Sequence, residues 1–226
     1  MELRSRLALR MAIVLPTVAA VIFLPAGSLG FWQGWVFLGI FVVFNAVLFD
    51  YFYKRDPKLL ERRLQNKERR REQKAFKVLW AAVWICTLTL PGFDYRFGWS
   101  QKLLAGVPIW LCLAGQAALT CSWFVIFEVF RFNTFASAVV QVEEGQRVIS
   151  DGPYRLVRHP MYSGIALMAL ATPLALGSLV ALPVAALKIP ILIYRLRDEE
   201  RVLRKELPGY GEYCARTPWR LVPHLY

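Results

Sequence analysis

Acidic residues, cysteines and repeats are all scarce in this sequence. The chain has 226 residues, with 28 Lys and Arg against 16 Asp and Glu, and only four cysteines. The cysteines form no C-x-x-C pair, and their spacing fits neither a zinc site nor a disulfide framework. We therefore expect no bound metal and free thiols in a reducing compartment. No internal repeat or low-complexity linker interrupts the chain, which predicts a single domain over residues 1–226.

Apolar side chains, by contrast, are abundant. The chain is 57% hydrophobic although its net charge is +12. A soluble domain is rarely so apolar, whereas a membrane protein with several spans and basic loops explains both values. Binding to nucleic acid is disfavoured, because the Lys and Arg residues flank apolar runs instead of covering a polar domain. The composition thus predicts an all-α integral membrane protein, with the lipid bilayer as its surroundings.

Five apolar segments are long enough to matter for a bilayer crossing, which takes about 20 helical residues. Four lie in residues 1–130, at Leu7–Leu29, Phe31–Tyr53, Phe76–Phe93 and Leu103–Phe130. The first is long and a second run follows it closely, which favours a retained span over a cleaved signal peptide. The fifth, Met161–Tyr194, is interrupted by Pro173 and by Gly177-Ser178, and we predict a tight hairpin of two short helices there. The total is five or six transmembrane helices.

Positive charge is concentrated in alternate connections. The segment Lys54–Lys77 holds eleven Lys or Arg residues, and Arg131–Arg158 and the C-terminal tail are also basic. The positive-inside rule then places both termini and these segments in the cytoplasm. For Lys54–Lys77 two interpretations stay open. It forms a helix on the membrane surface, with Leu59, Leu60, Leu64 and Phe76 facing lipid, or a solvated charged helix that only sets topology.

Two polar clusters lie beside the fifth apolar segment. Residues 146–162 read QRVISDGPYRLVRHPMY, in which Gly152-Pro153 predicts a turn and Pro160 suits the first turn of a helix. Residues 194–203 read YRLRDEERVL, and if they are helical, Arg195 and Glu199 share a face. Lys188, seven residues before Arg195, is an ionisable residue inside a predicted span. Such residues are candidates for function, but snorkelling or pairing with a carboxylate is the preferred interpretation for Lys188.

Three motifs after residue 133 carry a family resemblance. They are GPYRLVRHPMY, then R-x-x-x-E-E-x-x-L, and then GYGEY with a closing RLVP. In order and spacing these motifs resemble the isoprenylcysteine carboxyl methyltransferase family and its phospholipid methyltransferase relatives, and the bacterial-type members most. The resemblance implies an S-adenosylmethionine (SAM)-dependent membrane methyltransferase, with N-terminal spans in residues 1–130 and a cytoplasmic catalytic and SAM-binding part in residues 131–226. The sequence has no glycine-rich turn between a strand and a helix, which is the cofactor-binding element of a soluble-type methyltransferase.

The resemblance also implies residue roles. The implied SAM contacts are Gln141, Gln146, Arg147, Val148, Ile149, Tyr154, Arg158, His159, Pro160, Met161, Tyr162 and Glu199. Arg195 is implied to hold the substrate. Eukaryotic members have His where Gln146 stands, and the loop between Gln141 and Gln146 is shorter here.

The acceptor chemistry is open at this point. A lipophilic carboxylate, such as an isoprenylcysteine, would need only a cation to position it, and Arg195 can bind it with two hydrogen bonds. An amine, as in a phospholipid N-methyltransferase, would need a proton acceptor, for which Glu199 and Glu200 are the candidates. An NADPH-dependent enzyme similar to sterol reductases is a further alternative, because those proteins share an H-P-x-Y-like element. Oligomeric state is not indicated by the sequence.

Overall fold

The protein is a bundle of helices. The computed structural model describes residues 3–64, 71–135 and 145–226, and every regular element in these ranges is helical. Apolar segments become helices because this conformation satisfies every backbone hydrogen bond within the segment, as lipid requires. The elements are α1 (Leu3–Ala26), α2 (Trp32–Arg55), α3 (Pro57–Leu64), α4 (Arg71–Phe97), α5 (Trp99–Leu104), α6 (Ile109–Phe132), the 3₁₀ turn η1 (Gly152–Arg155), α7 (Pro160–Ala175), α8 (Leu182–Ala186), α9 (Lys188–Glu206) and α10 (Tyr210–Arg216).

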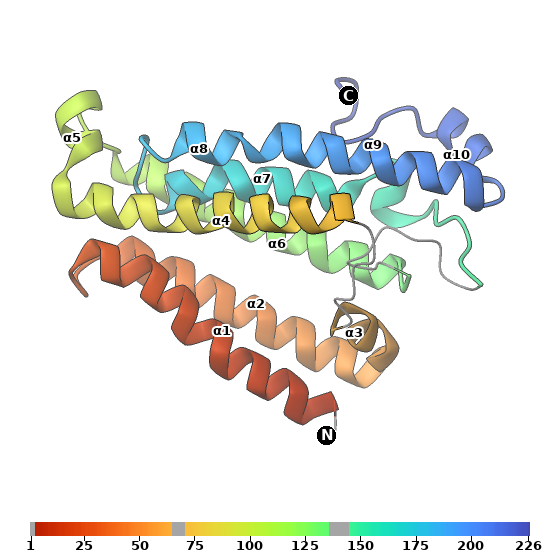
Figure 1. Ribbon diagram of the computed structural model, residues 1–226, viewed down its shortest axis with the longest axis horizontal. Helices are drawn as coiled ribbons and strands as arrows, with labels where there is room; N and C mark the ends of the chain where they lie inside the picture. The colour runs from red at the N-terminus through yellow and green to blue at the C-terminus, as the bar shows by residue number, and fades with distance from the viewer. Residues whose placement is uncertain (1–2, 65–70, 136–144) are drawn as a thin grey trace.

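The long helices run back and forth along one direction (Figure 1). Among the described residues, four helices are long and apolar enough to cross a membrane, namely α1, α2, α6 and the Val78–Phe97 part of α4, and α7 is a shorter apolar helix. The segments α3, η1 and α10 gather at one end of the bundle, which we call the basic end, and α5 lies at the opposite end. The prediction of an all-α integral membrane protein is confirmed.

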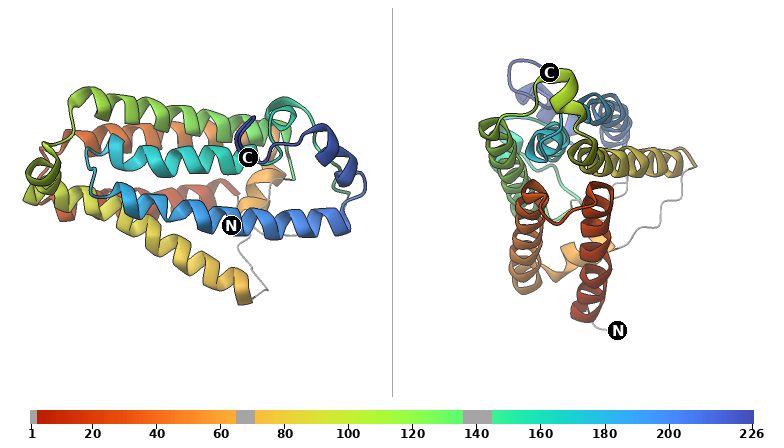
Figure 2. Two further views of the ribbon diagram at one scale, coloured as in Figure 1. Left: turned by 90° about the horizontal axis from the view of Figure 1, so that it is seen from above. Right: turned by 90° about the vertical axis from the view of Figure 1, so that its left-hand side faces the viewer.

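The predicted C-terminal hairpin is present. Helix α7 ends at Ala175, the chain turns through Gly177, whose φ is +69°, and α8 and α9 return beside α7 (Figures 1 and 2). At about 1.5 Å per residue, the 16-residue α7 is roughly 24 Å long, shorter than the roughly 36 Å of the 24-residue α6. The first residues of α7 are enclosed by other elements, since His159 and Tyr162 are both buried.

Close helix packing holds α7 against α6, and this is the most extensive contact between two elements. A side chain at Gly115 would collide with the backbone of Leu174 and Ala175, and one at Gly164 would press on Ser122 and Ile126. Glycine at both positions lets the two backbones approach, as expected for small residues in membrane bundles.

One predicted boundary was wrong. The fourth span begins at Ile109, not at Leu103, because Ala105 and Gly106 adopt positive φ angles and Pro108 starts a new helix. Leu103 lies instead in the short α5.

The segment Lys54–Lys77 is not one helix. Its first residues complete α2, which ends before Asp56. Helix α3 follows, and α4 begins at Arg71. Leu59 and Leu60 are buried against Leu7, Leu48 and other apolar residues, so neither lies on the exposed face of a helix that rests on the bilayer. The interpretation of these two leucines as the outer face of a surface-lying helix is therefore wrong.

Lys188 does not snorkel. Its side chain is 1% exposed, and its Nζ atom lies 3.4 Å from the ring centroid of Trp84 on α4. Within the part of the chain that the structure describes, Nζ has no hydrogen-bond partner. Contact with an aromatic face partly compensates the burial of an ammonium group. Lys188 therefore joins α9 to α4 through Trp84, and neither snorkelling nor the expected pairing with a carboxylate is seen among the described residues.

Candidate active site

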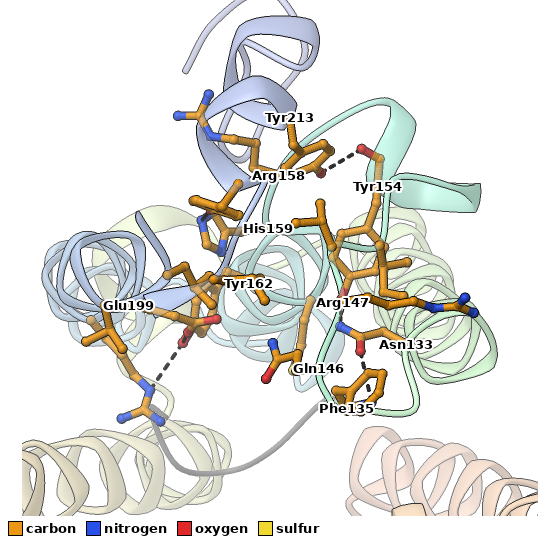
Figure 3. Close-up of a pocket in the computed structure, with 18 residues that line it drawn as sticks. Asn133, Phe135, Gln146, Arg147, Tyr154, Arg158, His159, Tyr162, Glu199 and Tyr213 are labelled. Atoms are coloured by element: carbon orange, nitrogen blue, oxygen red, sulfur yellow. Dashed lines mark hydrogen bonds between the residues drawn. The ribbon is translucent and has the colours of Figure 1, made fainter. Parts of the chain in front are cut away.

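A pocket opens at the basic end, where α7 begins and the polar half of α9 emerges (Figure 3). Its walls come from the end of α6, the segment 146–162, α9 and α10. The lining residues are Asn133, Phe135, Gln146, Arg147, Val148, Ile149, Tyr154, Arg158, His159, Met161, Tyr162, Arg195, Glu199, Val202, Leu203, Leu207, Tyr210 and Tyr213. Residues far apart in the chain thus form one polar cavity next to an apolar hairpin.

The segment that precedes α7 is shaped by Gly152. Its φ is +57°, and a side chain there would collide with the ring of Phe132. The 3₁₀ turn η1 follows, and His159 then stands at the N-terminal boundary of α7, directly before Pro160. Both the predicted turn at Gly152-Pro153 and the predicted helix start at Pro160 are confirmed.

The C-terminal tail fixes the backbone before α7. The amide of Arg158 donates to the carbonyl of Trp219 at 2.8 Å, and the amide of His159 donates to that of Arg220 at 3.0 Å. Ser163 Oγ donates to the carbonyl of Leu221 at 2.6 Å. The RLVP motif therefore lies against the RHP motif and holds His159 in place.

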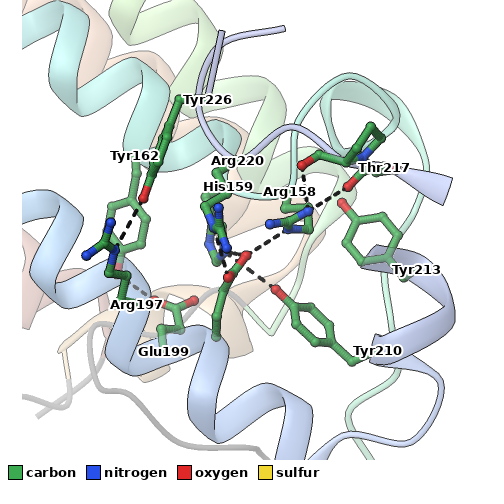
Figure 4. A network of polar contacts seen from close by, with 12 residues as sticks. Arg158, His159, Tyr162, Arg197, Glu199, Tyr210, Tyr213, Thr217, Arg220 and Tyr226 are labelled. Atoms are coloured by element: carbon green, nitrogen blue, oxygen red, sulfur yellow. Dashed lines mark hydrogen bonds and ion pairs between the residues drawn. The ribbon is translucent and has the colours of Figure 1, made fainter. Parts of the chain in front are cut away.

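Glu200 is buried and joins a polar network, whose members Arg158, His159 and Arg220 are labelled in Figure 4. Arg158 Nε donates to Oε1 at 2.7 Å, Arg220 Nε donates to Oε2 at 3.0 Å, and His159 Nε2 lies 3.4 Å from Oε1. Burial alone would raise the pKa of this carboxyl, but the hydrogen bonds from His159, Arg158 and Arg220 outweigh it and lower the pKa to about 2. Glu200 is therefore ionised at neutral pH, and both of its carboxylate oxygens accept hydrogen bonds within the protein.

A second cluster joins α7 to α9 through Tyr162. Arg195 Nε donates to the Tyr162 hydroxyl at 3.2 Å, and that hydroxyl donates to Glu199 Oε2 at 2.5 Å. The Tyr162 ring stacks on His159 with centroids 5.7 Å apart. Arg195 and Glu199 are four residues apart on α9 and both line the pocket, as their predicted shared face requires.

Tyrosines form the wall opposite this cluster. Tyr213 donates from its hydroxyl to the carbonyl of Tyr154 at 2.8 Å, and Asn133 Nδ2 donates to the Tyr154 hydroxyl at 2.8 Å. The Tyr210 hydroxyl lies 3.5 Å from His159 Nε2. Burial raises the pKa of Tyr210 and of Tyr213, so both hydroxyls keep their protons at neutral pH and can donate hydrogen bonds.

Most of the residues implied by the resemblance line this one pocket. Three do not: Pro160 begins α7 without lining it, Glu200 lies behind it, and Gln141 falls outside the described residues. Sequence reasoning assigned no role to Asn133, Phe135, Tyr210 or Tyr213. For the two tyrosines a signal existed, because both belong to the GYGEY motif. For the other two there was none, since only the end of α6 brings them here.

No metal centre is indicated in the described ranges, 3–64, 71–135 and 145–226. They contain no group of three or more His, Cys, Asp or Glu side chains that could hold a metal ion. The polar side-chain atoms of the pocket belong to arginines, one histidine, one carboxylate, tyrosine hydroxyls and two amides. Such a set suits a charged, hydrogen-bonding organic ligand.

The fold and the site together define the class of protein. It is an all-α membrane protein with several spans, and its polar pocket lies at the end of a short helical hairpin. Residues 109–205, from the start of α6 to the end of α9, match the isoprenylcysteine carboxyl methyltransferase (ICMT) family. The match covers less than half of the chain, and this part carries most of the pocket.

Three curated relatives are similar over parts of the chain. The Delta(14)-sterol reductase TM7SF2 of Mus musculus is 36% identical over 105 residues, 43% of this chain and 25% of that protein. The cobalt-zinc-cadmium resistance protein CzcN of Cupriavidus metallidurans is 37% identical over 76 residues, 31% of this chain and 33% of that protein. The protein-S-isoprenylcysteine O-methyltransferase B of Arabidopsis thaliana is 28% identical over 85 residues, 35% of this chain and 41% of that protein. The aligned parts thus span a quarter to about two fifths of each relative.

Proposed function

We propose that this protein is a SAM-dependent methyltransferase that acts on a lipophilic acceptor at the cytoplasmic face of a membrane. The observation that carries the proposal is the Arg195–Tyr162–Glu199 cluster, which lies in a polar pocket where α7 and α9 leave the apolar bundle. In this proposal a water-soluble cofactor would enter the pocket from the basic end, and the lipophilic acceptor would enter from the membrane between the helices. The family match over residues 109–205 and the similarity to the Arabidopsis relative support the same assignment.

The pocket fits SAM by the chemistry of its donors and acceptors. The cofactor carries an ammonium, a carboxylate, a sulfonium and an adenosine group. Glu199 would accept from its cationic part, and Arg147, the protonated tyrosines and Gln146 would bind its anionic and neutral polar groups. Val148, Val202 and Leu203 offer apolar surface for the adenine ring. Bound here, SAM supplies an activated methyl group for an in-line displacement, so alignment and exclusion of water are the main tasks of the protein.

Arg195 is the residue we assign to the acceptor. It is buried, with 8% of its surface exposed, and Tyr162 fixes its Nε atom. Its guanidinium group, which lines the pocket, would hold a carboxylate or phosphate of the acceptor with paired hydrogen bonds. A carboxylate acceptor held in this way needs no general base.

Glu199 is the carboxylate that could serve an amine acceptor. Glu200, the second candidate from the sequence, is held by Arg158 and Arg220 and does not line the pocket. With a pKa of about 2 it is a poor proton acceptor. If the acceptor is an amine, as in a phospholipid N-methyltransferase, Glu199 takes the proton and Glu200 does not.

The decisive experiment separates cofactor binding from transfer. Calorimetry with the detergent-purified chain measures binding of S-adenosylhomocysteine, with NADPH in parallel. Transfer of labelled methyl groups from SAM is measured into a prenylated cysteine analogue, a long-chain acid and phosphatidylethanolamine. We expect S-adenosylhomocysteine to bind the wild type and to bind Glu199→Gln more weakly. Arg195→Ala should bind S-adenosylhomocysteine almost as the wild type does, but its rate of methyl transfer should fall by at least about a hundredfold. That loss corresponds to a charge-assisted contact worth about 3 kcal/mol.

Exposed residues of α9 provide the controls. Arg201 and Glu206 lie on the solvent side of α9, so Arg201→Ala and Glu206→Gln should leave binding and transfer unchanged. Unaltered transfer in Arg195→Ala would contradict the assignment of Arg195. Binding of NADPH alone would replace the methyltransferase proposal by a reductase, the alternative that the mouse relative supports by its name.

A further inference from the structure

A second cavity lies between the N-terminal helices and α6. It has a volume of about 380 Å³. Helix α1 supplies one wall, α2 and α6 the others, and α3 closes the basic end. Its lining residues are Leu7, Arg10, Met11, Val14, Phe41, Asn45, Leu48, Phe49, Leu59, Leu60, Trp123, Ile126 and Phe130.

The cavity exists because α1 packs on the bundle through its second half. There Ile22 and Ala26 lie against the backbone of α4 at Gly92. In its first half, Leu7 is the buried residue, and it meets α3 through Leu59 and Leu60. Seen from the end with α5, α1 and α2 project as two separate legs, and α3 crosses between them at the far end (Figure 2). The cavity is lined by side chains of both helices, together with those of α3 and α6.

The lining is apolar with two exceptions, which differ in their contacts. Asn45 Nδ2 donates a hydrogen bond to the carbonyl of Phe41 at 2.8 Å. Arg10 is exposed, and it has no ion-pair or hydrogen-bond partner among the residues the structure describes. Arg10 lies seven residues after Leu3, hence about 10 Å along α1. At that depth a long arginine side chain reaches the headgroup layer of a bilayer.

We propose that this cavity binds one acyl chain of an anionic phospholipid from the bilayer, with the lipid phosphate on Arg10. The apolar walls favour a hydrocarbon occupant, and a volume near the lower end of small-molecule pockets suits a single chain. The free guanidinium at its edge favours an anionic headgroup over a zwitterionic one. Arg4 and Lys58, both exposed at the same end, add positive charge.

This site is distinct from the proposed catalytic pocket. The end of α6 separates the two: Phe130 and Ile126 face the lipid cavity, while Tyr154 and Met161 pack on the other side of the same cluster. The proposal therefore does not depend on methyltransferase activity.

Native mass spectrometry of the full chain in detergent tests the proposal. Phosphatidylglycerol and phosphatidylcholine with identical acyl chains are added at equal concentrations. We expect the wild type to retain phosphatidylglycerol about tenfold better, and Arg10→Gln to retain both lipids equally and weakly. Val14→Trp and Met11→Trp, which fill the cavity, should lose both adducts. Leu24→Trp is the matched control, because Leu24 is on the same helix with 75% of its surface exposed, and it should behave as the wild type.

The contradicting results are equally specific. Equal retention of the two lipids by the wild type would overturn the role of Arg10. Unchanged adducts in both tryptophan variants would overturn the cavity as the site. Melting temperatures of all variants are measured in the same samples, and a loss of adduct counts only for a variant that melts cooperatively. If one cavity variant fails to fold, the other decides.

Discussion

Glu199 and Glu200 are neighbours on α9 but have opposite surroundings. Successive residues of a helix point about 100° apart, so Glu199 faces the pocket and Tyr162 while Glu200 faces the arginines of the RHP segment and the tail. One carboxylate is available to a ligand, and the other stabilises the loop that carries His159. The Glu pair of the motif thus combines two tasks on one turn of helix.

Tyr162→Phe tests the residue that links α7 to α9. The change removes the hydroxyl that contacts Arg195 and Glu199 and keeps the ring that stacks on His159. Because a hydrogen bond to a charged group contributes about 1.5–3 kcal/mol, we expect the rate of methyl transfer to fall about tenfold to a hundredfold. The effect should be mainly in kcat, with the melting temperature nearly unchanged. Tyr194→Phe, at an exposed position of α9, is the control, and an equal effect of both changes would refute the linking role.

At the scale of elements, the hairpin of α7 and α8–α9 is anchored at the end opposite the pocket. Asp94 of α4 accepts hydrogen bonds from the Ser100 amide at 2.7 Å, the Ser100 hydroxyl and the Ser178 hydroxyl, and is buried. Ser100 Oγ in turn accepts from the amide of Leu179 at 3.0 Å. These contacts join α4, α5 and the turn of the hairpin, and so they set where α7 and α9 lie at the other end.

Asp94→Asn should destabilise this anchor. The amide nitrogen cannot accept a hydrogen bond, so at least one of the three buried donors loses its acceptor, at a cost of about 1–3 kcal/mol. We expect a melting temperature several degrees lower in detergent, with the affinity for S-adenosylhomocysteine retained in the folded protein. Asp50→Asn, whose ion pair with Lys54 is exposed, should have no measurable effect. An unchanged melting temperature in Asp94→Asn would show that the anchor does not hold the hairpin.

At the scale of the whole molecule, the network around Glu200 makes stability depend on pH. The pKa of Glu200 falls from 4.5 to about 2 on folding. A lowered folded-state pKa stabilises the protein above the unfolded-state pKa, and this contribution is lost as the pH falls from about 4.5 towards 2. It matters for the whole fold because Arg158 and Arg220 come from two segments far apart in the chain.

Glu200→Gln isolates this contribution. Thermal melts between pH 7 and pH 3 should show the wild type more stable than Glu200→Gln at neutral pH, with the difference shrinking below about pH 4.5. Glu206→Gln, at an exposed position of the same helix, should differ little from the wild type at any pH. A difference between wild type and Glu200→Gln that stays constant over this range would rule out the predicted linkage.

The sequence by itself determined the class of fold and the main site segments. Apolar length predicted the long spans, the Pro173 and Gly177-Ser178 interruptions predicted the hairpin, and the RHP and Glu-pair motifs located most of the pocket. These features are local, because span length and helix starts depend on neighbouring residues. The same local reasoning placed the start of the fourth span at Leu103, which was wrong, because it did not weigh the break at Ala105–Pro108.

Only the tertiary structure decided which side chains meet. The burial of Leu59 and Leu60, the contact of Lys188 with Trp84, the separation of Glu199 from Glu200 and the place of Asn133 all depend on how distant helices pack. Helical periodicity shows which residues share a face but not which neighbour covers that face. For this reason the sequence located the segments that carry the charged side chains, but it did not predict the partners of these side chains or the roles that depend on them.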